Sequence, residues 1–189
     1  MRHVILIGDS IRMGYQAGVR RLLEGECEVW APVENGGTSA NVLDHLDEWV
    51  LERPADLVHL NCGLHDLKRE RPKGALNVPL EAYRENIEAV FGRILERTGR
   101  RLVWASTTPV NQEWHRANKP FDRREADVLA YNQAAAEIAG RMGVAVDDLY
   151  RAVMDAGRDR LLAPDGVHFT AEGSDVLARA VAAAMRSAW

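Results

Sequence analysis

A short apolar run near the start of the chain, at residues 4–7, ends abruptly at Gly8-Asp9-Ser10. The run is β-branched and aliphatic on both faces, which is typical of a central strand in a parallel sheet covered by helices on each side. An amphipathic stretch, residues 11–23, follows at once. A strand, a tight turn and a helix in this order put Ser10 at the carboxyl end of the sheet, where open α/β sheets bind ligands.

Strand-like and helix-like stretches alternate along the rest of the chain. Further strands are predicted at residues 27–31, 56–61, 101–106 and 143–147. Helices are predicted at residues 11–23, 38–51, 80–98, 123–142, 148–156 and 171–187, with Gly99 ending the third of them. Five strands alternating with helices favour an α/β fold with a parallel sheet and helices on both faces. Without a repeat or a linker, residues 1–189 are expected to form one domain.

Composition excludes several classes of function. The chain is 47% hydrophobic and 28% charged, with a net charge of -4, which argues against a nucleic-acid-binding surface. No apolar run approaches the roughly 18 residues that would suggest a membrane span. Cys27 and Cys62 stand without a C-x-x-C motif or a ligand cluster, so neither a redox site nor a metal site is predicted. With no visible signal peptide, a cytoplasmic location is expected.

Four glycine-containing turns are expected at the carboxyl edge of the sheet, and the first and last can be read in two ways. They are Gly8-Asp9-Ser10, Asn35-Gly36-Gly37, Gly63-Leu64-His65-Asp66 and Asp165-Gly166-Val167-His168. Ser10 alone could be a plain helix N-cap, and Asp165 with His168 could be a simple turn beside a partly exposed imidazole. Together, a histidine oriented by a carboxylate can take the proton of a serine hydroxyl near neutral pH.

The four turns, in this order, resemble the GDSL, or SGNH, family of esterases and lipases. The resemblance covers residues 8–168. It implies a flavodoxin-like three-layer α/β/α sandwich with a five-stranded parallel sheet in the order 2-1-3-4-5, and ester hydrolysis through an acyl-enzyme without a metal or an organic cofactor. Ser10 resembles the family's nucleophile and first oxyanion donor, His168 its general base, and Asp165 the carboxylate that orients the base.

The resemblance is less complete for the oxyanion hole. Gly36 resembles the oxyanion glycine, with Gly37 as a close alternative. The family usually has G-x-N-D in the third turn, whereas this chain has His65 at the Asn position. A neutral imidazole N–H can donate a hydrogen bond to an oxyanion. Asn61, four residues earlier, is the other candidate for the third donor.

Other residues are weaker candidates for contact with the substrate. Asp9 reads as a structural turn residue more than as a second acid. Trp114 and His115 lie in a polar stretch, residues 111–122, that is expected to be a loop over the site and could contact an acyl or sugar group. Nearby basic residues could favour an anionic substrate, although a solvated charged loop is the favoured interpretation. These are Arg116, Lys119, Arg123 and Arg124.

These observations predict a serine esterase that acts on a small-molecule or carbohydrate ester. Short acyl groups such as acetyl are expected, because the sequence contains no hydrophobic lid. One alternative is an acyltransferase that uses the same serine, histidine and aspartate. A second is a catalytically inactive SGNH-like binding domain, which the substitution of His65 for Asn favours.

Overall fold

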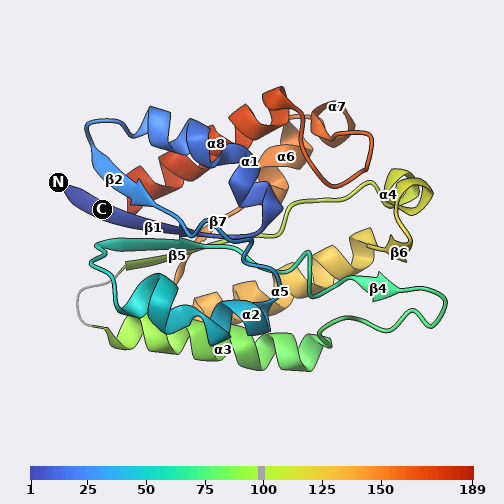
Figure 1. The fold of residues 1–189 in the computed structure, drawn as a ribbon, viewed down its shortest axis with the longest axis horizontal. Helices are drawn as coiled ribbons and strands as arrows, with labels where there is room; N and C mark the ends of the chain where they lie inside the picture. The colour runs from blue at the N-terminus through green and yellow to red at the C-terminus, as the bar shows by residue number, and fades with distance from the viewer. Residues whose placement is uncertain (98–100) are drawn as a thin grey trace.

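A five-stranded parallel sheet forms the middle layer of the structure, a computed structural model that describes residues 1–97 and 101–189 (Figure 1). Its strands are β1 (Arg2–Ile7), β2 (Cys27–Trp30), β3 (Leu57–Leu60), β5 (Arg101–Ala105) and β7 (Ala145–Asp147). They are arranged in the order β2-β1-β3-β5-β7. Counted along the chain within this sheet, that is the predicted order 2-1-3-4-5, and the predicted α/β fold is confirmed.

Strand β1 lies in the interior of the sheet, as its apolar sequence predicts. Val4 stands opposite Val29 of β2 on one side and Leu57 of β3 on the other. The side chains of residues 4–7 are at most 1% exposed. A strand that is buried on both faces needs apolar residues at every position rather than at alternate ones, which explains the unbroken run.

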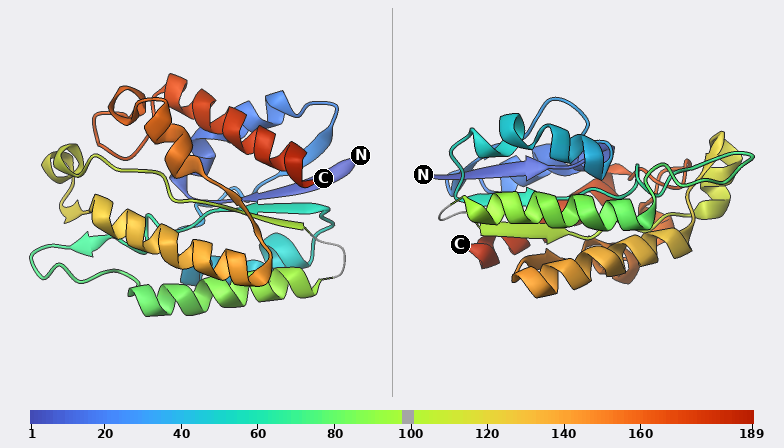
Figure 2. Two further views of the ribbon diagram at one scale, coloured as in Figure 1. Left: turned by 180° about the vertical axis from the view of Figure 1, so that it is seen from behind. Right: turned by 90° about the horizontal axis from the view of Figure 1, so that it is seen from below.

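Helices cover both faces of the sheet (Figures 1 and 2). One face carries α1 (Ser10–Leu22), α6 (Leu149–Asp155) and α8 (Ala171–Ala188), and the other carries α2 (Ser39–Asp44), α3 (Leu80–Glu96) and α5 (Glu125–Met142). Helices α1 and α8, from opposite ends of the sequence, pack closely. A Cβ atom at Gly18 of α1 would lie 2.8 Å from Cβ of Ala178 in α8, so the glycine permits this approach.

Short elements extend beyond the carboxyl edge of the sheet, and one of them corrects a prediction. Strands β4 (Arg69–Glu70) and β6 (Phe121–Asp122) pair antiparallel, and α7 (Arg158–Leu161) precedes the last loop. Residues 111–122, expected to be a loop, contain helix α4 (Gln112–Asn118). The Asn111 side chain caps this helix by accepting a hydrogen bond from the Trp114 N–H, 3.1 Å away.

One predicted helix is interrupted in the structure, and the predicted end of another lies outside the described residues. The stretch 38–51 is not one regular helix, because α2 is followed by a π-helical turn, η1 (Asp47–Leu51). Thr38 caps α2 by accepting from the Asn41 N–H. Helix α3 is described to Glu96, and Gly99, its predicted end, lies outside the described residues. Across the described residues, no helix is long and apolar enough to cross a membrane.

Candidate active site

The turn after β1 presents Ser10 at the first position of α1. Asp9, not Ser10, is the N-cap: its Oδ1 accepts a hydrogen bond from the Ile11 N–H at 2.9 Å. The interpretation of Ser10 as a plain cap is therefore wrong. Because Asp9 caps the helix, the Ser10 hydroxyl is not needed for that role and can face the last loop of the chain.

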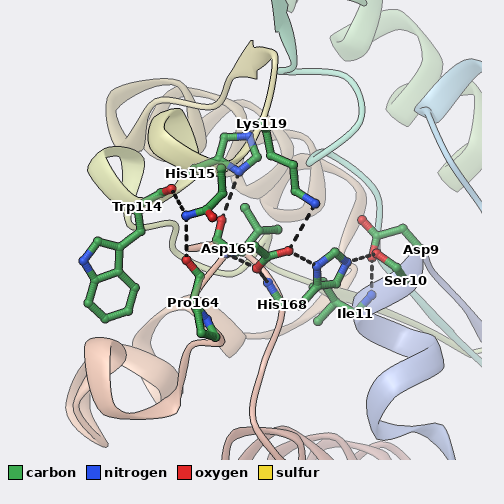
Figure 3. A network of polar contacts seen from close by, with 11 residues as sticks. Asp9, Ser10, Ile11, Trp114, His115, Lys119, Pro164, Asp165 and His168 are labelled. Atoms are coloured by element: carbon green, nitrogen blue, oxygen red, sulfur yellow. Dashed lines mark hydrogen bonds and ion pairs between the residues drawn. The ribbon is translucent and has the colours of Figure 1, made fainter.

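Ser10, His168 and Asp165 form a chain of hydrogen bonds (Figure 3). Ser10 Oγ lies 2.9 Å from His168 Nε2, and His168 Nδ1 lies 2.6 Å from Asp165 Oδ2. The second carboxylate oxygen, Oδ1, accepts from the backbone N–H groups of Val167 and His168. If Nδ1 carries the proton and donates to Asp165, Nε2 is free to accept the proton of the Ser10 hydroxyl.

The charge on Asp165 suits this arrangement. Burial opposes its ionisation, but the hydrogen bonds from the His168 ring and from the His168 and Val167 N–H groups outweigh burial and hold its pKa at about 2. Lys119 adds a positive charge, with its Nζ 3.6 Å from Asp165 Oδ2. The carboxylate is therefore ionised at neutral pH and can stabilise an imidazolium on His168.

Helix α4 supports the loop that carries Asp165 and His168. His115 is fully buried, and its Nδ1 lies 3.3 Å from the Asp165 carbonyl oxygen. The Asn118 side chain donates to the Pro164 carbonyl at 3.0 Å. Gly166 adopts a φ of 72°, and its carbonyl accepts from the Asn111 N–H at 2.8 Å. The loop is thus fixed by contacts on the side away from Ser10.

The predicted backbone donors of an oxyanion hole have different surroundings. Among the described residues, no partner is found for the Ser10 N–H, as expected at the start of a helix. The Gly36 N–H donates to the Gly8 carbonyl at 3.0 Å, and the Gly37 N–H donates to Asn35 Oδ1 at 2.9 Å. Both glycine amides thus already have acceptors, and among the described residues the Ser10 N–H is the one predicted backbone donor without an acceptor.

The two candidates for the third donor also differ. Asn61 is buried, and its side-chain amide donates to the Ala105 carbonyl of β5 at 2.8 Å. The His65 ring is half-buried and makes no hydrogen bond with any described residue. Burial lowers the pKa of His65, which favours the neutral imidazole. The geometry therefore favours His65 over Asn61 as a donor to a bound oxyanion.

The structure changes the interpretation of the three candidates for substrate contact. Asp9 is 1% exposed and His115 is fully buried, so neither reaches the surface. His115 instead contacts the loop of Asp165, as described above. Trp114 is 37% exposed and lines a hollow of about 470 Å³ with Leu162 and Pro164. Figure 3 shows its indole ring on the far side of Asp165 from Ser10.

Arg12 is a residue of the site region that sequence reasoning missed. It is 1% exposed and joins the turn before Ser10 to the loop before Gly36. Its guanidinium donates to the carbonyl oxygens of Gly8 at 3.3 Å, Pro32 at 3.0 Å and Glu34 at 2.7 Å. Arg12 shares the helical spacing of Tyr15 and Val19, which form the buried face of α1. This spacing is the sequence pattern that could have predicted a buried arginine here.

The remaining candidates for chemistry lie outside this site. Cys27 and Cys62 are both buried free thiols. Burial raises the pKa of the Cys62 thiol, which makes it a poor nucleophile. In the part of the chain that the structure describes, no group of three or more His, Cys, Asp or Glu side chains could hold a metal ion.

Comparison with known proteins identifies the class to which this fold and site belong. The sequence profile of the GDSL-like lipase/acylhydrolase family matches residues 6–176. The chain belongs to this family and is a serine-type ester hydrolase. No match was found among curated protein sequences.

Several solved structures share the fold over nearly their whole length. The lipase/acylhydrolase from Enterococcus faecalis is 23% identical, with a TM-score of 0.85 over 99% of this chain and 96% of that one. An acetyl xylan esterase, AlAXEase, is 18% identical, with a TM-score of 0.78 over 96% and 98% of the two chains. A variant of the acetyl xylan esterase from Geobacillus stearothermophilus is 19% identical, with a TM-score of 0.79 over 97% and 94%.

Proposed function

We propose that the chain hydrolyses esters of short acyl groups, with acetyl groups on a carbohydrate as its substrate class, through an acyl-enzyme on Ser10. The observation that carries this proposal is the hydrogen-bonded chain from Ser10 Oγ through His168 to Asp165, with distances of 2.9 Å and 2.6 Å. The acetyl xylan esterases among the similar structures support the choice of substrate class.

In the first half of the proposed reaction, His168 Nε2 takes the proton of the Ser10 hydroxyl as Oγ attacks the ester carbonyl carbon. The carbonyl oxygen becomes an oxyanion, to which the Ser10 N–H and the His65 ring donate hydrogen bonds. The imidazolium, stabilised by Asp165, then gives its proton to the departing alcohol. The bond between the carbonyl carbon and the alcohol oxygen breaks, leaving the acyl group on Oγ.

In the second half, water attacks the acyl-enzyme while His168 takes a proton from it. Collapse of the second tetrahedral intermediate releases the acid and returns the proton to Ser10 Oγ. Both halves use the same three side chains, so a variant that lacks any one of them should lose hydrolysis. If an alcohol or a thiol attacked in place of water, the same machinery would transfer the acyl group.

The test uses p-nitrophenyl acetate with the wild type and with Ser10→Ala and His168→Ala. Both variants should lose roughly 10³-fold or more in kcat. Equal slow release of nitrophenol by all three proteins would overturn the proposal. Comparing acetate, butyrate and octanoate esters tests the acyl length, and release of acetate from acetylated xylo-oligosaccharides tests the alcohol part. Product analysis with a competing alcohol separates hydrolysis from transfer.

A further inference from the structure

Arg123, between β6 and α5, is a buried cation with few partners. It is 7% exposed, and its Nε donates to the Leu64 carbonyl at 2.6 Å. Its guanidinium carbon lies 5.1 Å from the centre of the Phe121 ring. Within residues 1–97 and 101–189, neither a hydrogen bond of its two Nη groups nor an ion pair with a carboxylate is found. The favoured sequence interpretation, a solvated charge on a loop, is therefore wrong for Arg123.

Other inward-facing arginines of this chain are much better satisfied. Arg12 donates to three carbonyl oxygens and to Gln16 Oε1. Arg69 makes two hydrogen bonds to the carboxylate of Asp127, at 2.6 Å and 2.8 Å. A buried charge without a partner is costly, and a guanidinium offers a planar fork of donors that matches a carboxylate. In Arg123, Nε is used, but neither Nη group has a partner among the described residues.

Arg123 is one of the residues that line a hollow of about 310 Å³. Gln112, Glu113, Arg116, Asp122, Arg123 and Arg124 line it. Three arginines against two carboxylates leave the hollow with an excess of one positive charge. One negative charge fits this balance better than the two of a phosphate group, because Glu113 and Asp122 would repel the second charge.

Arg123 contacts both the hollow, which it lines, and the turn that carries His65. Leu64, whose carbonyl Arg123 binds, is adjacent to His65 in the chain. Burial lowers the pKa of His65 and of His115, and the positive charge of Arg123 lowers both further. Because Arg123 Nε lies 2.6 Å from the Leu64 carbonyl oxygen, a group bound at Arg123 would lie near the turn that carries His65.

We propose that Arg123 and this hollow form a subsite for a carboxylate carried by the ester substrate. This inference rests on the proposed function, and it narrows the substrate class from short-acyl esters in general to those that also carry a carboxylate. The carboxylate accepts two hydrogen bonds from the Nη groups of Arg123, while the ester bond lies at Ser10. Arg116 and Arg124, which are exposed, attract the anion toward the hollow.

The test compares matched pairs of esters. Phenyl acetate is paired with 4-acetoxybenzoate, which carries the carboxylate on the alcohol side. Phenyl butyrate is paired with the phenyl monoester of succinic acid, which carries it on the acyl side. In at least one pair, the wild type should favour the acidic ester in kcat/KM by roughly ten- to hundredfold. If the wild type shows no preference in either pair, the proposed subsite is wrong. This result needs only the wild type, so it holds even if no variant can be purified.

Substitution separates recognition of the anion from a structural role of Arg123. Arg123→Gln and Arg123→Lys should both reduce the preference for the acidic ester, because each removes the fork of donors. Arg151→Gln, the control, removes one charge from an exposed position on α6 and should leave the preference unchanged. An equal loss for the acidic and the neutral ester in both Arg123 variants would mean that Arg123 only holds Leu64 in position.

A binding measurement keeps this inference separate from the proposed function. In Ser10→Ala, 4-hydroxybenzoate or monomethyl succinate should raise the Tm, whereas the corresponding amides should not. Arg123→Gln in the same background should abolish the shift. If the wild type hydrolyses no ester but these acids still bind, the proposed function fails and the subsite stands. If neutral esters are hydrolysed and neither acid binds, the subsite alone fails.

Discussion

Ser10 Oγ and His168 Nε2 lie 2.9 Å apart although 158 positions separate the two residues in the chain. One follows the first strand and the other precedes the last helix, and both meet at the carboxyl edge of the sheet. Asp165 continues the contact on the other side of the imidazole (Figure 3). Five predictions test how this region and its supports work.

Asp165→Asn should lower kcat by about 10³- to 10⁴-fold with little change in KM. A neutral amide does not stabilise an imidazolium as the carboxylate does, and its NH2 group can donate to Nδ1 and hold the wrong tautomer of His168. Steady-state kinetics with p-nitrophenyl acetate measures the loss. Lys119→Met is the contrasting variant, because it removes a half-exposed neighbour of the same carboxylate and should change kcat only a few-fold. Losses of similar size in both variants would contradict this ranking.

His65→Ala should lower kcat by about 10²-fold or more while raising KM much less, because an oxyanion donor acts mainly in the transition state. His65→Asn restores the residue that the family usually has at this position and should recover most of the activity. Asn61→Ala is the second comparison. If Asn61→Ala lowers kcat and His65→Ala does not, the third donor is Asn61, and its bond to the Ala105 carbonyl must open during the reaction.

Arg12→Lys should lower both kcat and Tm. A lysine ammonium cannot span the carbonyl oxygens of Gly8, Pro32 and Glu34, so the turn of Ser10 and the loop of Gly36 lose their common anchor. Arg20→Lys on the same helix is the matched control, because Arg20 is exposed and, within residues 1–97 and 101–189, donates only to the Val29 carbonyl. A lower Tm with unchanged kcat would limit Arg12 to a role in stability.

Gly166→Ala should destabilise the fold and lower kcat. Its φ of 72° costs an alanine about 1–2 kcal/mol. In addition, the new Cβ would lie 2.5 Å from the Asn111 carbonyl oxygen and would push the loop away from α4. Gly143→Ala separates the two effects, since Gly143 has a φ of 68° but no described atom within 4 Å of its Cβ position. That variant should lose stability and keep kcat.

Asp66 should make stability depend on pH between about 4 and 6. Burial raises its pKa to about 6 from a usual 3.8, against hydrogen bonds from the Ser39 hydroxyl and N–H. In that window Asp66 holds a proton in the folded chain that it has released in the unfolded chain. The stability that depends on Asp66 is therefore fully present below pH 4 and is lost as the pH rises through 6. Between pH 4 and 6, the unfolding free energy of Asp66→Asn should increase by about 2 kcal/mol relative to that of the wild type. Urea unfolding measures this, and a constant difference would refute the effect.

The strands and the serine, histidine and aspartate could be predicted from sequence because each has a local signal. The apolar run of residues 4–7 identifies the interior strand, and the turns carry the reactive residues at family spacing. Helix α4 has no such signal, because its one buried side chain is the polar His115. The partners of the Gly36 and Gly37 amides depend on how two distant loops pack, which no periodicity in the sequence encodes.

The packing of α1 against α8 has a consequence for protein synthesis. Ribosomes make Ser10 early and His168 late, and α1 lacks its packing partner α8 until the end of the described chain has been made. A nascent chain that stops before Asp165 carries a hydroxyl that nothing deprotonates. Ester cleavage should therefore begin only after translation has passed α8 and that helix has docked, so the order of synthesis itself keeps the growing polypeptide inert.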